Sequence, residues 1–153
     1  MRLLLTAATV LNMGSCFYEA SQPLTPTSTA HVDEFLIGTW QVAAQDAGDH
    51  VRIRAFDDRS YLLEIDSKGT RDVMRAHSTE ISGARILNVT SIESATSKYM
   101  FFRYDWAGDT LVVRAVKDAA PPPLAGPKTL RAWLSERIDD RRIYDDVARL
   151  VRR

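Results

Sequence analysis

The chain has little that would cross-link it or bind a metal, because its 153 residues include a single cysteine, Cys16. One thiol excludes an internal disulfide bond and a zinc site built from several cysteines. The chain also lacks an apolar run of the roughly 20 residues that a membrane-spanning helix needs. Its length permits one domain with a hydrophobic core that forms without covalent cross-links.

An excess of charge of either sign is also missing. Lys and Arg together number 20, as do Asp and Glu, so the formal net charge at pH 7 is zero. The basic residues are interleaved with acidic ones along the chain and are not clustered. A nucleic-acid-binding surface needs a basic patch that attracts phosphates, so the sequence predicts no nucleic-acid partner.

Motifs that carry catalysis are absent as well. The sequence contains no Gly-x-Ser-x-Gly elbow, no P-loop and no dinucleotide-binding fingerprint. The three histidines, His31, His50 and His77, are far apart and lack metal-ligand spacing. His77 is expected at the solvent or in a rim contact. We therefore expect a protein that is not an enzyme and has no metal or cofactor. An enzyme would require polar residues that converge in a pocket.

Residues 1–15 have the pattern of a signal peptide. Arg2 is followed by an apolar stretch from Leu3 to Leu11 and then by the small residues Gly14 and Ser15. The only cysteine comes next, and this order resembles the lipobox of bacterial lipoproteins. The resemblance implies that Cys16 carries lipid, palmitate included. It also implies an anchor in the bacterial cell envelope facing the periplasm, with the outer membrane favoured. Ordinary secretion is one alternative, and a buried N-terminal helix with Cys16 in the core is another.

Residues 16–35 are expected to form the lipidated cysteine and a flexible tether. Small polar residues and prolines dominate this stretch from Ser21 to Thr29, and no apolar period is visible.

Residues 36–117 have the pattern of a series of short strands joined by turns. Val51, Ile53 and Ala55 alternate with Arg52 and Arg54, which is typical of a half-buried strand. Turn signals recur at short intervals, among them Lys68-Gly69 and Ser82-Gly83. We expect about seven strands in an antiparallel meander that closes into a barrel or a curled sheet. The fold class is therefore mainly β.

The hairpin near residue 106 leaves two registers open. Asp105 and Gly108 suit a type I turn with a bulge, which would place Arg114 on the face of Met100, Phe102 and Tyr104. A loop of two or four residues would place Leu111, Val113 and Ala115 on that face instead. A slip of one residue exchanges the two faces of a strand, so this choice decides whether Arg114 points inward.

Residues 118–127 contain three consecutive prolines and are expected to form an extended connector. Residues 128–153 are expected to form helices packed on the barrel, because apolar residues recur at helical spacing. The first apolar face includes Leu130, Trp133 and Leu134, and the second includes Ile143, Tyr144, Val147, Leu150 and Val151. A helix that binds a membrane surface or a partner is the alternative.

Gly38-Thr39-Trp40, at the start of the first strand, resembles the Gly-x-Trp signature of lipocalins and the wider calycin group. The resemblance implies a barrel whose tryptophan closes the base while an arginine from a late strand packs across its ring, which is a favourable cation–π contact. The matching arginine would be Arg114. Lipobox, tether, meander and helix together resemble the small uncharacterised lipoproteins of bacterial envelopes, for which no activity is implied.

Large side chains on the expected sheet form the candidate site. They either fill the core or line a cavity for an apolar ligand. The candidates for binding a ligand or lining the barrel are Trp40, Tyr61, Met100, Phe102, Tyr104 and Arg114. The sequence thus favours a membrane-anchored lipoprotein that binds a small hydrophobic ligand or a protein partner. The alternative is a structural or assembly accessory with a filled barrel and a partner-binding rim or helix.

Overall fold

The computed structural model describes residues 17–43, 49–93, 98–123 and 126–153. Strands and one α-helix, α1 (Pro127–Arg137), make up most of this part of the chain. The strands are β1 (Glu19–Ala20), β2 (Gly38–Val42), β3 (His50–Ala55), β4 (Tyr61–Ser67), β5 (Thr70–Ile81), β6 (Ala84–Ser91), β7 (Tyr99–Ala107), β8 (Thr110–Val116) and β9 (Tyr144–Arg152). Short 3₁₀ turns lie at Thr27–Thr29, Glu34–Leu36 and Arg141–Ile143.

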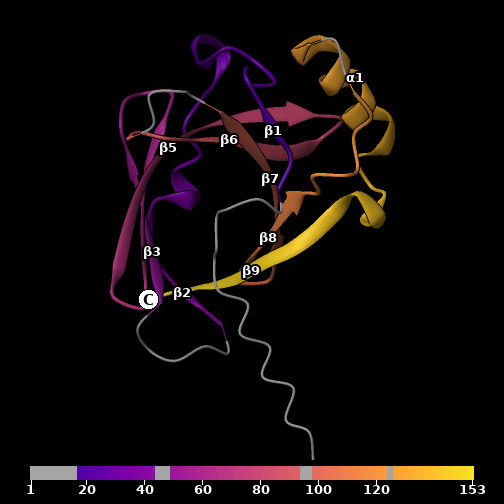
Figure 1. Ribbon diagram of the computed structural model, residues 1–153. Coiled ribbons are helices and arrows are strands. Elements are labelled where there is room, and N and C mark those ends of the chain that lie inside the picture. Colours follow the sequence, from indigo (N-terminus) through magenta and orange to yellow (C-terminus); the bar gives the residue numbers. More distant parts are fainter. Residues whose placement is uncertain (1–16, 44–48, 94–97, 124–125) are drawn as a thin grey trace, which may run out of the picture.

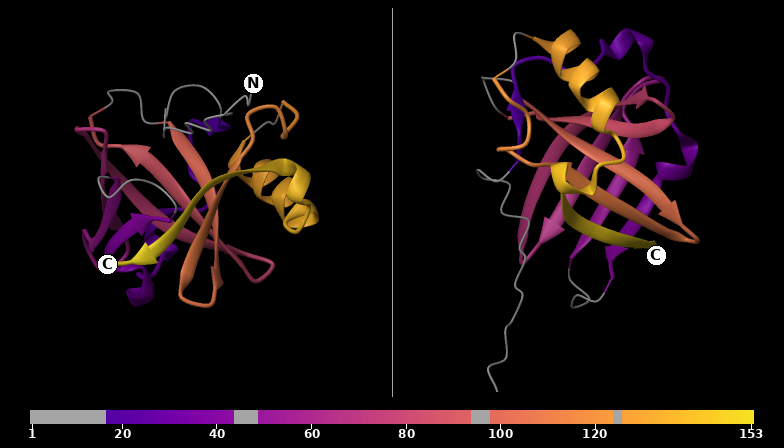
Figure 2. Two further views of the ribbon diagram at one scale, coloured as in Figure 1. Left: turned by 90° about the horizontal axis from the view of Figure 1, so that it is seen from below. Right: turned by 90° about the vertical axis from the view of Figure 1, so that its right-hand side faces the viewer.

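Strands β2 to β8 form an antiparallel meander in which each strand pairs with the next. Strand β9 then pairs with both β8 and β2, which closes an eight-stranded antiparallel barrel (Figure 1). The mainly β, calycin-like fold expected from the sequence is therefore confirmed. In Figure 2 the view from below (left) shows the strands curving around a common axis, with α1 outside the barrel wall.

Alternating side chains and tight turns explain the meander. Along β4, Tyr61, Leu63 and Ile65 are buried while the residues between them are half-buried. The expected turn between β4 and β5 is formed by Lys68 and Gly69, which both have positive φ. Such turns match the twist of the paired strands. The alternation of buried side chains and the residues of the turns thus predict the same strands, and these strands form where the sequence predicts them.

The hairpin of β7 and β8 adopts the register with a two-residue loop. Ala107 pairs with Thr110, and Gly108, at a φ of 61°, takes the first loop position, where glycine avoids strain. Phe102 pairs with Ala115 and Tyr104 with Val113, so the apolar residues of both strands face the interior. Apolar matching across the hairpin decided the register, and the alternative with Arg114 inside is wrong.

The second half of the C-terminal segment is a strand, not the helix expected from its apolar spacing. Tyr144–Arg152 pairs along β8 and β2 and makes the eighth strand of the barrel. A register shift opposite Val113 and Arg114 breaks the strict alternation of side chains in β9. Without β9 the main-chain donors and acceptors on the facing edges of β2 and β8 would stay unpaired, and pairing them outweighs helix propensity.

The N-terminal segment is packed, so the expectation of a flexible tether is wrong for residues 17–35. β1 pairs with β7, and Leu24 and Ala30 are buried. The main-chain N–H of Leu24 donates to the buried Asn88 side chain at 2.8 Å. Main-chain groups of this segment therefore satisfy polar side chains on the outer face of the barrel, which the composition of the segment did not reveal.

Helix α1 covers a second apolar cluster on the outside of the barrel, as expected of the first C-terminal segment. Leu130 and Leu134 pack with Ile86, Phe101 and Val116. The three prolines before the helix lie outside any strand. The molecule therefore has two apolar layers, one inside the barrel and one between its wall and α1.

Candidate functional site

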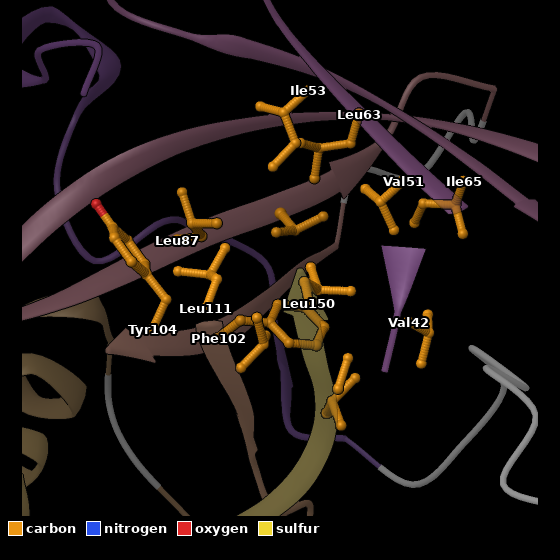
Figure 3. Close-up of a pocket in the computed structure, with 14 residues that line it drawn as sticks. Val42, Val51, Ile53, Leu63, Ile65, Leu87, Phe102, Tyr104, Leu111 and Leu150 are labelled. Carbon is orange, nitrogen blue, oxygen red and sulfur yellow. The ribbon is translucent and has the colours of Figure 1, made fainter. Parts of the chain in front are cut away.

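The barrel interior contains a cavity of about 80 Å³ that is lined by side chains from the strands of the barrel (Figure 3). All of the lining residues are apolar or aromatic, and the only side-chain polar atom among them is the hydroxyl of Tyr104. They are Val42, Val51, Ile53, Leu63, Ile65, Leu87, Val89, Phe102, Tyr104, Leu111, Val113, Val147, Ala148 and Leu150. A space this small and apolar favours a hydrocarbon group over water, which needs polar partners.

Trp40 closes one end of the barrel, here called the closed end. Its ring is fully buried and its indole N–H donates to the carbonyl oxygen of Leu36 at 2.9 Å. The ring of Trp106 packs against it with a centroid distance of 5.7 Å. Trp40 therefore seals the barrel and does not line the cavity.

The arginine that packs across Trp40 is Arg152 of β9, not Arg114 of β8. The guanidinium carbon of Arg152 lies 4.6 Å from the ring centre of Trp40. Its two terminal nitrogens donate to the carbonyl oxygens of Ile37, at 2.9 Å, and Phe35, at 2.7 Å. The sequence missed this residue because β9 was assigned to a helix.

Arg114 lies on the outer face of the barrel, which corrects its place among the lining candidates. It pairs with Arg103 across the hairpin and donates to the carboxylate of Asp105 at 2.8 Å. Asp146 of β9 lies 3.4 Å from its Nε. The two-residue loop turns the odd-numbered side chains of β7 outward, so Asp105 meets Arg114 there.

The other sequence candidates all belong to the interior core, but only two of them line the cavity. Phe102 and Tyr104 do so, whereas Met100 and Tyr61 pack in the surrounding core. Burial raises the pKa of the phenol of Tyr61 and that of Tyr104 above their usual value. Burial therefore favours the neutral phenol form of both side chains.

Phe17 fills the wall where β7 and β8 diverge. Its main chain bridges to Lys117, just beyond β8, and its ring meets that of Phe102 edge-on with a centroid distance of 5.6 Å. Because Phe102 lines the cavity, Phe17 supports the cavity wall from the N-terminal side. Cys16, the expected lipid attachment site, lies outside the described residues.

His77 is buried on the outer face of β5, so its expected position at the solvent or rim is wrong. Its Nε2 lies 2.8 Å from the carbonyl oxygen of Thr25 in the N-terminal segment. Burial lowers the pKa of the imidazole, the hydrogen bond to Thr25 opposes this, and the charge of Arg75 adds to the lowering. A neutral imidazole that donates to Thr25 ties the N-terminal segment to the barrel.

Within the described residues, no three His, Cys, Asp or Glu side chains come close enough to share a metal ion. None of the helices in the same part of the chain is long and apolar enough to cross a membrane.

Comparisons with known proteins found no match, whether to a protein-family model, to a curated protein or to a solved structure.

Proposed function

We propose that this chain is a non-enzymatic binding protein of the bacterial cell envelope whose barrel interior takes up a small hydrophobic ligand. The observation that carries the proposal is the cavity lined by apolar side chains. A ligand that enters it gives up contact with water and gains contact with aliphatic and aromatic groups. Among the described residues that line the cavity, none carries a charge that would bind a charged group.

The dimensions of the cavity narrow the class of ligand. Its volume of about 80 Å³ is well below the roughly 300 Å³ at which drug-sized pockets begin. The end of an unbranched hydrocarbon chain suits it, with any polar head group left outside the apolar lining. Decanoic acid is a suitable probe, because it has one flexible chain and a head group that keeps it dispersed.

Binding of decanoic acid, followed by chemical shifts of methyl groups, tests this proposal. Ala148→Leu adds three carbon atoms to a residue that lines the cavity, so we expect it to weaken binding at least 10-fold. Ala107→Leu is the matched control, since Ala107 is exposed on β7. Equal affinities of the wild type and both variants, or no binding at all, would contradict the proposal.

The envelope anchor is a separate part of the proposal and has its own test. It rests on the signal-like residues 1–15 followed by Cys16. Intact mass of the protein purified from bacterial membranes should match a chain that begins at Cys16 and carries acyl groups. Cys16→Ser should lose that mass. A mass equal to that of the full unprocessed chain in both preparations would contradict the lipid anchor. It would leave the proposed ligand site untouched.

A further inference from the structure

A groove of about 760 Å³ lies outside the barrel at its closed end. We call it the closed-end groove, and its main residues are Phe35, Trp40, Arg85, Trp106, Asp109 and Arg152. None of its lining residues also lines the interior cavity. The groove is therefore a second surface, independent of the proposed ligand site.

Exposed apolar side chains gather around this groove. Phe35 is 73% exposed, and Trp106 and Val151 are each 37% exposed. Within the described part of the chain the other large exposed apolar residues are Phe56 and Ile92, which lie beside a different crevice. A group of exposed apolar side chains that includes a tryptophan is typical of an interaction surface.

Arg152 gives the groove a fixed positive charge. Its guanidinium is held by the carbonyl oxygens of Phe35 and Ile37 and by the ring of Trp40, none of which carries a net charge. Among the described residues no carboxylate forms an ion pair with it, whereas Arg85 is paired with Asp33 at 3.0 Å. A carboxylate from outside the chain would therefore find a preoriented partner.

Phe35 decides between a small molecule and a protein as the occupant. A small ligand in the groove would leave most of this projecting ring in water. A protein partner can cover the ring while it fills the groove between Trp106 and Arg152. Asp109 on the rim disfavours a uniformly acidic partner, so the complementary surface carries a carboxylate within an apolar patch.

We propose that the closed-end groove docks a protein partner that presents a carboxylate to Arg152 and apolar side chains to Phe35 and Trp106. Arginine and tryptophan side chains often carry most of the energy of such an interface. This proposal does not depend on what the barrel interior binds. The docking surface and the interior ligand site can therefore be contradicted separately.

The test uses a displayed library of random 12-residue peptides selected on the intact protein. We expect enriched peptides that combine Asp or Glu with large apolar residues. Changing their acid to the amide should weaken binding about 10-fold, as should Phe35→Ser in the protein. Phe56→Ser is the matched control, because Phe56 is also exposed but lies outside the groove.

Four results would overturn the proposal. The first is selection without enrichment, and the second is a set of peptides that bind Phe35→Ser as tightly as the wild type. The third is self-association that Phe35→Ser abolishes in sedimentation, because the groove would then bind a second copy of this chain. The fourth is binding to phosphatidylglycerol vesicles that Phe35→Ser alone abolishes, because the surface would then face lipid.

Discussion

The guanidinium carbon of Arg152 lies 4.6 Å from the ring centre of Trp40, and this contact joins the last strand of the barrel to its first. The two residues are also paired across β2 and β9. The contact thus lies where β9 pairs with β2 to close the barrel, and it covers the ring that seals the closed end. Four predictions on stability follow from this and related contacts.

Replacing Arg152 with alanine should lower the free energy of unfolding by about 2 kcal/mol. The change removes a sheltered cation–π contact and two hydrogen bonds to carbonyl oxygens. Urea denaturation measures the loss. Arg149→Ala, at an exposed position of the same strand, should change stability by less than about 0.5 kcal/mol. Equal effects of the two substitutions would show that Arg152 adds nothing beyond strand propensity.

Ending the chain at Ile143 should abolish cooperative unfolding. The truncation removes β9 and leaves the facing edges of β2 and β8 unpaired, which promotes association between molecules. Circular dichroism during heating and size-exclusion chromatography monitor both effects. Arg153→Ala is the control, because it keeps the main-chain hydrogen bond from residue 153 to the carbonyl oxygen of Thr39 at 3.0 Å, and it should leave a monomer with wild-type melting. A truncated chain that stays monomeric and melts cooperatively would refute the role given to β9.

Stability should fall as the pH drops below about 6.5, the pKa of a histidine in an unfolded chain. Burial lowers the pKa of His77 in the folded protein. Just below pH 6.5 the imidazole is therefore protonated in the unfolded chain but still neutral in the folded protein. The unfolding free energy therefore rises with pH from the lowered pKa up to about 6.5. Urea melts across this range should show a smaller slope for His77→Gln. An unchanged slope would mean that other groups cause the dependence.

Asn88→Ala should lower the free energy of unfolding by about 2 kcal/mol and weaken the attachment of the N-terminal segment to the barrel. The buried Asn88 amide accepts from Leu24 at 2.8 Å and donates to Thr79 at 2.8 Å and to the carbonyl oxygen of His77 at 3.1 Å. Its loss leaves these groups without partners. Urea denaturation measures the cost, and thermolysin should cleave before Leu24 faster than in the wild type.

Thr90→Val is the matched control for Asn88→Ala. Thr90 lies on the same strand, and its buried hydroxyl has no hydrogen-bond partner within the described residues. The change should leave stability within about 0.5 kcal/mol and cleavage unchanged. Faster cleavage of this variant would show that any change in β6 loosens the segment.

The alternation of apolar residues and the turn residues in the sequence were enough to predict the meander. In β4 each buried side chain is followed by one that is half-buried, and the turn at Lys68 and Gly69 has the residues its backbone requires. These signals are short-range, so a single sequence carries them. The meander of β2 to β8 followed from them, as did Phe102 and Tyr104 as residues that line the interior. The strand that closes the barrel, β9, did not.

Contacts between distant segments could not be predicted in the same way. Val147 and Leu150 are three residues apart, which fits a helical period better than strand alternation, and only the register shift in β9 lets both face the interior. Pairing with the edges of β2 and β8, which no local pattern shows, decides for the strand. Leu24 lies among serines, threonines and prolines, and its burial depends on Asn88 of β6. For the same reason, the sequence pointed to Arg114 where the structure has Arg152.

Contacts between the protein and decanoic acid, measured as intermolecular nuclear Overhauser effects, test the central claim most directly. We predict contacts from the alkyl chain to the methyl groups of Val147, Leu150 and Leu63, which line the cavity. Leu130 and Leu134, buried between α1 and the outer wall, should show none. Contacts confined to those outer residues, or none at a saturating concentration of the acid, would contradict a binding site inside the barrel.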